Sequence, residues 1–225
     1  ANRQDANAYL PTGQEAADQA AAAFEAHVES EGVTISSEDA DEAGSAARAQ
    51  GQAKDTVVAM ASHYARKVAP KVDPIAVERK VETRPKDASY ELVGIIDLVE
   101  EGATAGAGEV ISDLKTTTRA PKKNAIETSV QLPIYTLLRA SETGVLPTDT
   151  VLRHLVQRGT GAVEVVEQRL APSLDVLKAT VARLDIAAQG IQAGVFLPAE
   201  ASSWKCSLKW CSYAPTCKFF TGRKA

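Results

Sequence analysis

Two apolar segments that each carry a carboxylate constrain this sequence more than any other feature. Asp97 stands inside the aliphatic run 92–99, and the run 110–115 ends in Asp113-Leu114-Lys115. Short aliphatic runs bounded by glycine predict β-strands. Side chains alternate along a strand, so Asp113 and Lys115 share one face and Leu114 takes the other. Residues 102–108 contain three glycines, and we therefore expect a turn there and a pairing of the two strands.

These two acids indicate a site for a divalent cation. Burying a carboxylate among aliphatic side chains is unfavourable unless its charge is neutralised, and two converging carboxylates repel each other. Mg²⁺ or Mn²⁺ prefers oxygen ligands, lowers the pKa of a bound water and offsets charge on a phosphate. Lys115 would add a second positive charge. The alternative is an exposed acid on each strand, with Lys115 in an ordinary surface ion pair.

A helix predicted near residues 123–140 carries the next polar pair. Its apolar residues recur at helical spacing, at Ile126, Val130, Ile134, Leu137 and Leu138. Gln131 and Tyr135 are four residues apart and therefore lie on one face. Alternatively, they are a polar residue and a half-buried tyrosine on an amphipathic helix.

Together, Gly94-x-x-Asp97, Asp113-x-Lys115 and Gln131-x-x-x-Tyr135 resemble the PD-(D/E)XK nuclease superfamily, in particular its RecB-like branch of CRISPR-associated and phage exonucleases. The resemblance covers residues 70–140, and the cysteine tail at 204–220 adds to it. It implies an α/β restriction-endonuclease-like sandwich with a mixed central sheet. It also implies a metal at the two acids, assistance from Lys115, and a helix face that borders the active site.

The resemblance further implies a third metal-binding acid on the preceding strand and a histidine in an early helix. Glu78, in the predicted strand 75–83, is our choice for the acid; a solvated charge ladder with Arg79 and Lys80 is the alternative. No histidine follows Gly13 closely, so Asp18 or His27 replaces it or the position is empty. We assign no metal-binding role to the three histidines, His27, His63 and His154.

The cysteines form a second signal, because Cys206, Cys211 and Cys217 all lie in one short tail. Three cysteines do not form closed disulfides, and their spacing is not that of a redox pair. Clustered thiolates suit a soft metal or an iron–sulfur cluster, which usually needs four ligands. The resemblance implies a four-iron cluster whose fourth cysteine comes from near the N-terminus, and we expect that residue in an upstream segment. Inert thiols are the alternative.

Charge is spread unevenly along the chain, whose net charge is −4. Residues 1–55 hold eleven acidic and three basic residues, which leaves 22 basic and 18 acidic residues in the remainder. Basic residues follow the second acid at Lys115, Arg119, Lys122 and Lys123, and residues 201–225 hold five bases and no acid. Such patches fit a phosphate backbone, although a run of charges is also typical of a solvated face.

The order of predicted elements favours one α/β domain of 225 residues. We expect a helical region at 1–70 (helices 14–30 and 53–68 around a loop at 31–51), a core at 71–200 and the cysteine tail at 201–225. Within the core, strands near 75–83, 89–100 and 109–115 precede the Gln131 helix, and strands near 150–158 and 162–169 precede a helix near 173–193. Without an apolar run of membrane-spanning length or a secretory signal, we expect the cytoplasm of a bacterial, archaeal or phage-infected cell.

The sequence therefore predicts a Mg²⁺- or Mn²⁺-dependent deoxyribonuclease, an exonuclease on DNA ends or single strands. Its partners would be DNA and proteins of recombination or CRISPR adaptation. One alternative is a non-catalytic DNA-binding or assembly subunit that keeps the fold, favoured by the missing histidine and the acidic N-terminal region. The other is an unrelated metal-binding scaffold in which Asp97 and Asp113 never meet.

Overall fold

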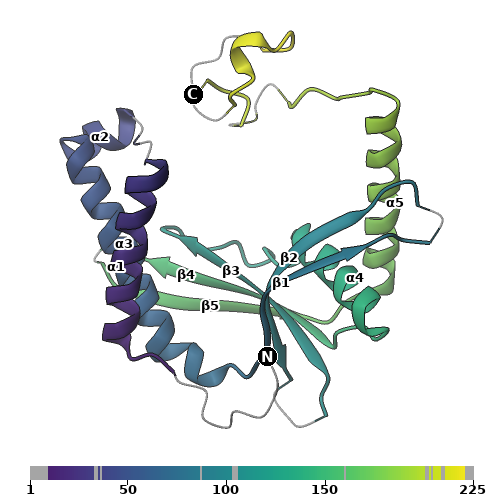
Figure 1. Ribbon diagram of the computed structural model, residues 1–225, viewed down its shortest axis with the longest axis horizontal. Helices are drawn as coiled ribbons and strands as arrows, with labels where there is room; N and C mark the ends of the chain where they lie inside the picture. Colours follow the sequence, from purple (N-terminus) through teal and green to yellow (C-terminus); the bar gives the residue numbers. More distant parts are fainter. Residues whose placement is uncertain are drawn as a thin grey trace.

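A mixed β-sheet lies at the centre of the computed structural model, which describes residues 10–32, 35, 37–86, 88–102, 106–159, 161–200, 203, 205–208 and 211–220 (Figure 1). Five strands of this described part join in the order β1-β2-β3-β4-β5. They are β1 (Pro74–Thr83), β2 (Leu92–Glu101), β3 (Glu109–Thr117), β4 (Asp149–Gln157) and β5 (Val163–Leu170). The five predicted strands are thus confirmed within a few residues at their ends.

The sheet is mixed because one of its connections is a helical crossover. β1-β2-β3 and β4-β5 are antiparallel, whereas β3 and β4 run parallel. Helix α4 (Gln131–Thr143) follows β3 and carries the chain back along the sheet, so that β4 begins beside the start of β3. The predicted α/β architecture with a mixed central sheet is therefore confirmed.

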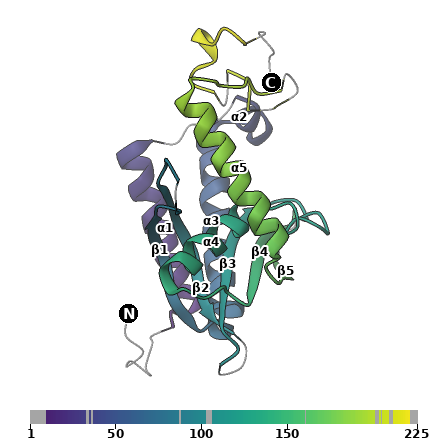
Figure 2. The same ribbon diagram turned by 90° about the vertical axis from the view of Figure 1, so that its right-hand side faces the viewer.

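Helices cover both faces of the sheet (Figures 1 and 2). α4 packs on β1, β2 and β3, and α5 (Leu174–Gln192) packs on α4. On the other face, α3 (Ala46–Lys67) contacts β4 and β5, and α1 (Gly13–Glu31) and α2 (Ser37–Ala43) pack on α3. The main core lies under α4 and consists largely of the fully buried side chains Ile96, Val99, Ile111, Leu132 and Leu138.

Two predicted boundaries were wrong. The segment 31–51 was expected to be a loop, but it contains α2 and the first turns of α3. Ser45 caps α3 by accepting a hydrogen bond from the backbone N–H of Arg48 (3.2 Å), which starts the helix seven residues before the predicted boundary. The helix predicted from 123 begins at Gln131, because residues 123–128 form turns that bond to β5 through Gln168.

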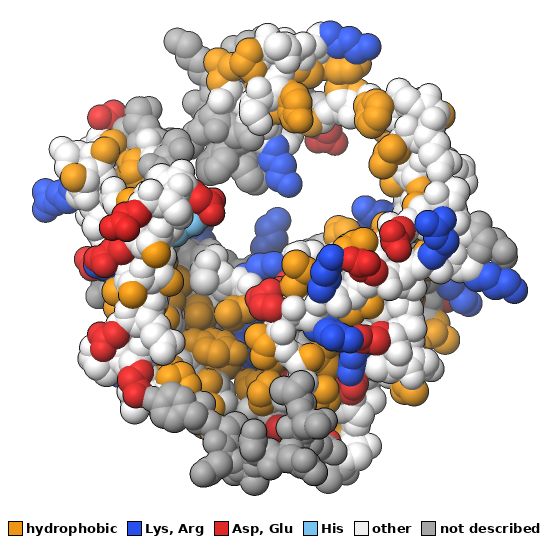
Figure 3. All heavy atoms as spheres, in the orientation of Figure 1, with side chains coloured by type: hydrophobic (Ala, Val, Ile, Leu, Met, Phe, Trp, Pro, Cys, Tyr) orange, Lys and Arg blue, Asp and Glu red, His pale blue; other side chains and the backbone are white. Residues whose placement is uncertain are grey.

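The N-terminal helices, the sheet, α5 and the C-terminal segment surround a central opening (Figure 3). After α5 the chain runs to the short 3-10 helix η2 (Ala214–Thr216), which lies past the end of α5 that is farther from the sheet. Lys and Arg side chains lie at the rim of the opening on several sides. No helix among the described residues is long and apolar enough to span a membrane.

Candidate active site

Strands β2 and β3 separate at the two acids. Within the described residues they pair from Glu101 opposite Glu109 to Leu98 opposite Ser112, and the ladder then ends. Asp97 and Asp113 are the next residue on each strand, so both carboxylates stand where the strands diverge. The Asp97 carboxylate accepts a hydrogen bond from the backbone N–H of Leu114 at 3.0 Å. The prediction that the two acids lie on neighbouring strands is confirmed.

Asp113 is completely buried, with no exposed surface. Lys115 Nζ donates a hydrogen bond to its Oδ1 at 3.0 Å and lies 2.9 Å from its Oδ2. That second contact lacks hydrogen-bond geometry, and Oδ2 accepts no hydrogen bond from the described residues. Burial raises the pKa of the Asp113 carboxyl; the neighbouring Asp97 adds to the rise and Lys115 opposes it.

Lys115 connects the acid pair to α4. Its ammonium group also donates to Gln131 Oε1 at 2.7 Å, and Gln131 Nε2 donates to the Tyr135 hydroxyl at 3.3 Å. Burial raises the pKa of Tyr135, and the negative charges of Asp97 and Asp113 raise it further. The structure thus brings together five of the predicted site residues, from β2, β3 and the first turns of α4.

Local sequence explains why α4 starts at Gln131 and lies so close to the sheet. Pro133 occupies the first turn, where its missing N–H has no intrahelical partner to lose. On β2, a Cβ at Gly94 would lie 2.5 Å from Leu138 Cδ1 and 3.8 Å from Tyr135 Cε1. The glycine of the Gly94-x-x-Asp97 pattern therefore makes room for the helix that carries Gln131 and Tyr135.

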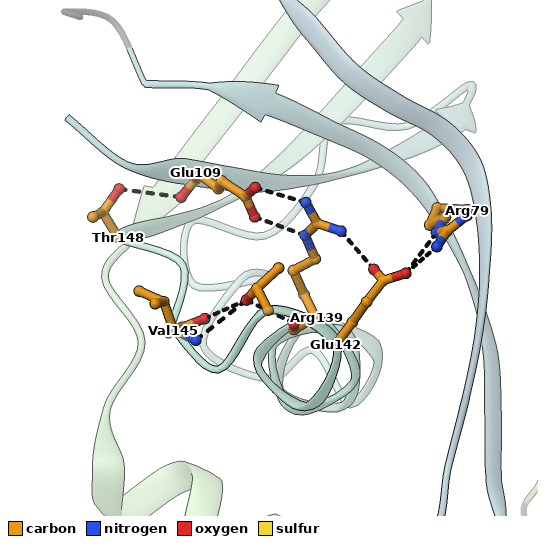
Figure 4. Close-up of polar contacts among 7 residues, drawn as sticks. Arg79, Glu109, Arg139, Glu142, Val145 and Thr148 are labelled. Atoms are coloured by element: carbon orange, nitrogen blue, oxygen red, sulfur yellow. Dashed lines mark hydrogen bonds and ion pairs between the residues drawn. The ribbon is translucent and has the colours of Figure 1, made fainter. Parts of the chain in front are cut away.

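An ion-pair cluster holds the other end of α4 on the sheet (Figure 4). The Arg139 guanidinium is nearly buried and donates two hydrogen bonds to Glu109 on β3, at 2.6 and 2.7 Å. It also donates to Glu142 at 2.5 Å, and Glu142 accepts hydrogen bonds from Arg79 on β1. Bidentate pairing fixes both the distance and the orientation of the partners, so this cluster restrains α4 against β1 and β3.

Glu78 lies across from Asp97 on β1, because Val77 pairs with Leu98 and Arg79 pairs with Ile96. Its backbone φ is +47°, in the left-handed region that an L-residue seldom adopts. Arg79 pairs with Glu142 and Lys80 with Glu82, whereas Glu78 has no ion pair within the described chain. Glu78 and Asp97 line one cavity. Arg79 and Lys80, which the charge-ladder alternative would place with Glu78, thus bind other acids.

Asp97 and Asp113 offer oxygen ligands of the kind that Mg²⁺ or Mn²⁺ prefers, and Asp113 Oδ2 is a buried oxygen without a hydrogen bond. A cation therefore fits the chemistry of the pair. In the described residues no three His, Cys, Asp or Glu side chains converge closely enough to form a metal group. Neither proposed substitute for the early histidine completes one: Asp18 accepts a hydrogen bond from Gln14, and His27 lies near Glu31.

His154, for which the sequence predicted no role, is a neighbour of the site. It lies opposite Lys115 in the parallel β3–β4 pairing and is only 8% exposed. Its Nδ1 atom is buried without a hydrogen-bond partner in the described chain, and burial lowers the pKa of the imidazole. The adjacent polar residues Arg153 and His154 inside a buried strand were the available signal, but the register of His154 with Lys115 was not visible in the sequence.

The three cysteines are half-buried free thiols in the C-terminal segment. As placed, they do not form a three-ligand metal group within the described residues. Trp204 and Trp210 of the cysteine tail lie outside those residues. The present arrangement therefore does not fit a cluster.

The chain matches the family described as PD-(D/E)XK nuclease superfamily over residues 4–218. No curated protein sequence is significantly similar. Among solved structures, SSO0001 is 16% identical, with a TM-score of 0.47, and the match covers 92% of this chain and 96% of that one. A "Putative exonuclease" from Eubacterium rectale is 9% identical, with a TM-score of 0.45 and coverage of 92% and 77%. Since the family match spans nearly the whole sequence, this chain belongs to the PD-(D/E)XK nuclease superfamily.

Proposed function

We propose that this protein is a metal-dependent deoxyribonuclease that removes nucleotides from DNA ends or single strands. One observation carries the proposal: a single ammonium group, Lys115 Nζ, contacts both the buried Asp113 carboxylate and Gln131, at the point where β2 and β3 separate. An acid pair, a cation and a polar helix face thus surround one point. That is the set of groups that phosphodiester hydrolysis requires.

Each residue has a distinct role in this proposal. Asp97 and Asp113, with Glu78 as a third acid, would hold Mg²⁺ or Mn²⁺. The bound cation would supply a water of lowered pKa and offset the charge that grows on the phosphate. Lys115 assists water activation and stabilises the developing negative charge from the Asp113 side. Gln131 orients the Lys115 ammonium through its Oε1 atom and, with Tyr135, lines the site.

DNA is the proposed substrate because basic residues follow β3 and lie along parts of the central opening. Arg119, Lys122 and Lys123 lie in the segment between β3 and α4, directly after the catalytic strand. Lys and Arg side chains also lie at the rim of the central opening. Such a distribution suits a polyanion that crosses the acid pair. We place the enzyme in recombination or CRISPR adaptation, in the cytoplasm of a bacterial, archaeal or phage-infected cell.

The cysteine segment is a separate part of the proposal. Cys206, Cys211 and Cys217 would need to move together and gain a fourth ligand to bind an iron–sulfur cluster. Iron, sulfide and zinc analysis of anaerobically purified protein, with Cys211→Ser as control, tests this. Absence of all three from a folded preparation would remove the cluster from the proposal and leave the nuclease site unaffected.

The nuclease proposal is tested with end-labelled single- and double-stranded DNA in Mg²⁺, Mn²⁺ or EDTA. Asp113→Ala, purified in parallel, controls for contaminating nuclease. Metal-dependent cutting that Asp113→Ala lacks is the expected result, and the product ladder reports polarity and end preference. Equal cutting by both proteins would overturn the proposal.

A non-catalytic DNA-binding subunit is the second candidate. It is favoured by the absence of a three-ligand metal group among the described residues and by the missing early histidine. The same experiment separates the two candidates, because DNA binding without cutting by a folded preparation would select the subunit.

A further inference from the structure

A cavity of about 500 Å³ lies on the face of the sheet that α3 covers and reaches Asp97, where β2 and β3 separate. Asp97 and Glu78 line its wall together with Leu114, which lies between Asp113 and Lys115 in the sequence. Its size falls within the range of small-molecule sites, roughly 300–1,000 Å³. Asp97 therefore connects the acid pair to the cavity, whereas the fully buried Asp113 is not part of the cavity wall.

The lining of this cavity is mostly apolar although the cavity is open to solvent. Three of its side chains are large, apolar and exposed: Leu10 (51%), Val77 (65%) and Leu114 (38%). Tyr64 from α3 adds an aromatic ring, whereas the nearly buried Ser112 and Arg153 are bonded to Glu100. Figure 3 shows hydrophobic side chains gathered below the central opening, between the N-terminal helices and the sheet. Exposed apolar surface of this kind beside a polar site is typical of ligand recognition.

We propose that this cavity binds the unpaired nucleobase of the nucleotide next to the scissile phosphate. The proposal rests on the nuclease function proposed above. Each base of a polynucleotide is attached to the sugar beside its phosphate, so a phosphate held at Asp97 and Glu78 brings a neighbouring base to the cavity wall. The flat, apolar faces of a base match Val77, Leu114 and the Tyr64 ring.

Binding at this site gives the enzyme a preference for unpaired bases that does not depend on the base sequence. A base inside a duplex is stacked and paired and must leave the helix before it enters a pocket, whereas a single-stranded base is already free. Apolar and aromatic contacts accept every base because each has the same kind of face. The cavity therefore selects single strands and frayed ends over intact duplex.

The first test uses the substrate and leaves the protein unchanged. A single abasic residue is placed at successive positions of an end-labelled single strand, which is digested in Mg²⁺ or Mn²⁺. Stacking of a base on a protein surface contributes enough binding energy that its loss should slow cutting about tenfold or more at one position relative to the scissile bond. Digestion through every abasic position at the normal rate would overturn the inference.

A matched pair of variants tests the cavity itself. Val77→Asn places an amide at the mouth of the cavity, and Val93→Asn makes the same change on the partner strand, where Val93 pairs with Glu82 and lies outside the cavity lining. Both valines are at least half exposed, so both variants should fold. Val77→Asn should weaken single-strand binding and cutting about tenfold, while Val93→Asn should match wild type. Equal behaviour of the two variants would count against base binding.

Fluorescence separates failure of this inference from failure of the nuclease proposal. A strand with 2-aminopurine near its end is titrated with protein in EDTA, where no cutting is expected. Entry of the base should change the emission in wild type and Val93→Asn, and less in Val77→Asn. An unchanged emission in an enzyme that cuts would reject the base site alone, whereas no cutting in Mg²⁺ or Mn²⁺ would reject the nuclease and leave the fluorescence result standing.

Discussion

The backbone N–H of Leu114 donates a hydrogen bond to the side chain of Asp97, 17 residues earlier in the chain, where a sheet would normally place a backbone carbonyl. β2 and β3 are thus joined through the Asp97 side chain at the place where their ladder ends. This contact ties the position of Asp97 to the Asp113-x-Lys115 strand. The geometry of the proposed site therefore depends on the backbone of β3 as much as on its side chains.

Lys115→Ala should abolish cutting and leave metal binding largely intact. The Lys115 side chain is 40% exposed and its ammonium group contacts Asp113 and Gln131, so its removal takes away a charge but no metal ligand. We expect kcat to fall by about 100-fold or more, the lower range for loss of a positioned proton-transfer or charge-stabilising group. Steady-state kinetics and Mn²⁺ titration calorimetry measure the two effects.

The control for this experiment is Asp113→Ala, which should lose both cutting and metal affinity. If Lys115→Ala cut DNA at the wild-type rate, Lys115 would have no part in the chemistry.

Asp113→Asn should raise the melting temperature of the metal-free protein at neutral pH. Burial raises the pKa of Asp113 in the folded protein above its unfolded value, so the native state prefers the protonated carboxyl. The stability that this group contributes is complete below the unfolded pKa and is lost as pH rises through the folded pKa. The difference between variant and wild type should therefore shrink on acidification from pH 7 to pH 4.

Calorimetric scans across that pH range in EDTA provide the measurement. Added Mn²⁺ should reverse the order of stability at neutral pH, because ligand binding stabilises the protein that holds the metal. A variant that gains as much from Mn²⁺ as wild type would show that Asp113 is not a ligand.

Gly94→Ala should displace α4 and reduce activity. The new Cβ would meet Leu138 Cδ1 at 2.5 Å, and Leu138 is fully buried. Overpacking of this kind typically costs about 1–3 kcal/mol of stability. Because Gln131 and Tyr135 begin the same helix, we also expect kcat to fall at least about tenfold.

Gly51→Ala is the matched control, since Gly51 is exposed on α3 and its Cβ would meet nothing within 4 Å. It should gain roughly 0.5–1 kcal/mol from helix propensity. Normal activity in a folded Gly94→Ala protein would mean that the closeness of α4 to β2 does not matter for catalysis.

Arg139→Gln should destabilise the fold by about 1.5–3 kcal/mol, the usual contribution of hydrogen bonds to charged groups. Its guanidinium side chain is 11% exposed and is the group that joins Glu109 to Glu142. Chemical denaturation gives the stability. Arg79→Gln, on the more exposed edge of the same cluster, should cost at most about 1 kcal/mol. Similar losses in both variants would argue against a central role for Arg139.

The architecture and the acid pair were predictable because they depend on local patterns. Alternation along residues 109–117 places Asp113 and Lys115 on one face, and the four-residue spacing of Gln131 and Tyr135 places both on one side of α4. The glycines between β2 and β3 indicated the antiparallel connection, in which Gly102 N–H donates to Gly108 C=O at 2.8 Å. These features need no knowledge of contacts distant in sequence.

Other features depend on pairings that no local pattern specifies. His154 reaches Lys115 only through the parallel register of β3 and β4, and Arg139 meets Glu109 across 30 residues. The late start of α4 follows from the bond between the Ile126 N–H and Gln168 on β5. The helices within 31–51 were missed because acidic and glycine-containing composition outweighed the local cap at Ser45.

The early end of the β2–β3 ladder gives the site a mechanical property. Beyond Leu98 the β1–β2 hairpin continues to Thr83 and Leu92 without β3, and contacts with α4 and the Tyr90–Asp185 hydrogen bond to α5 hold it instead. A cation bound by Asp97 and Asp113 would link the hairpin to β3 at the point where the β2–β3 hydrogen bonds end. Metal binding would then also stiffen the hairpin, and slower exchange of the Leu114 amide hydrogen would report both effects.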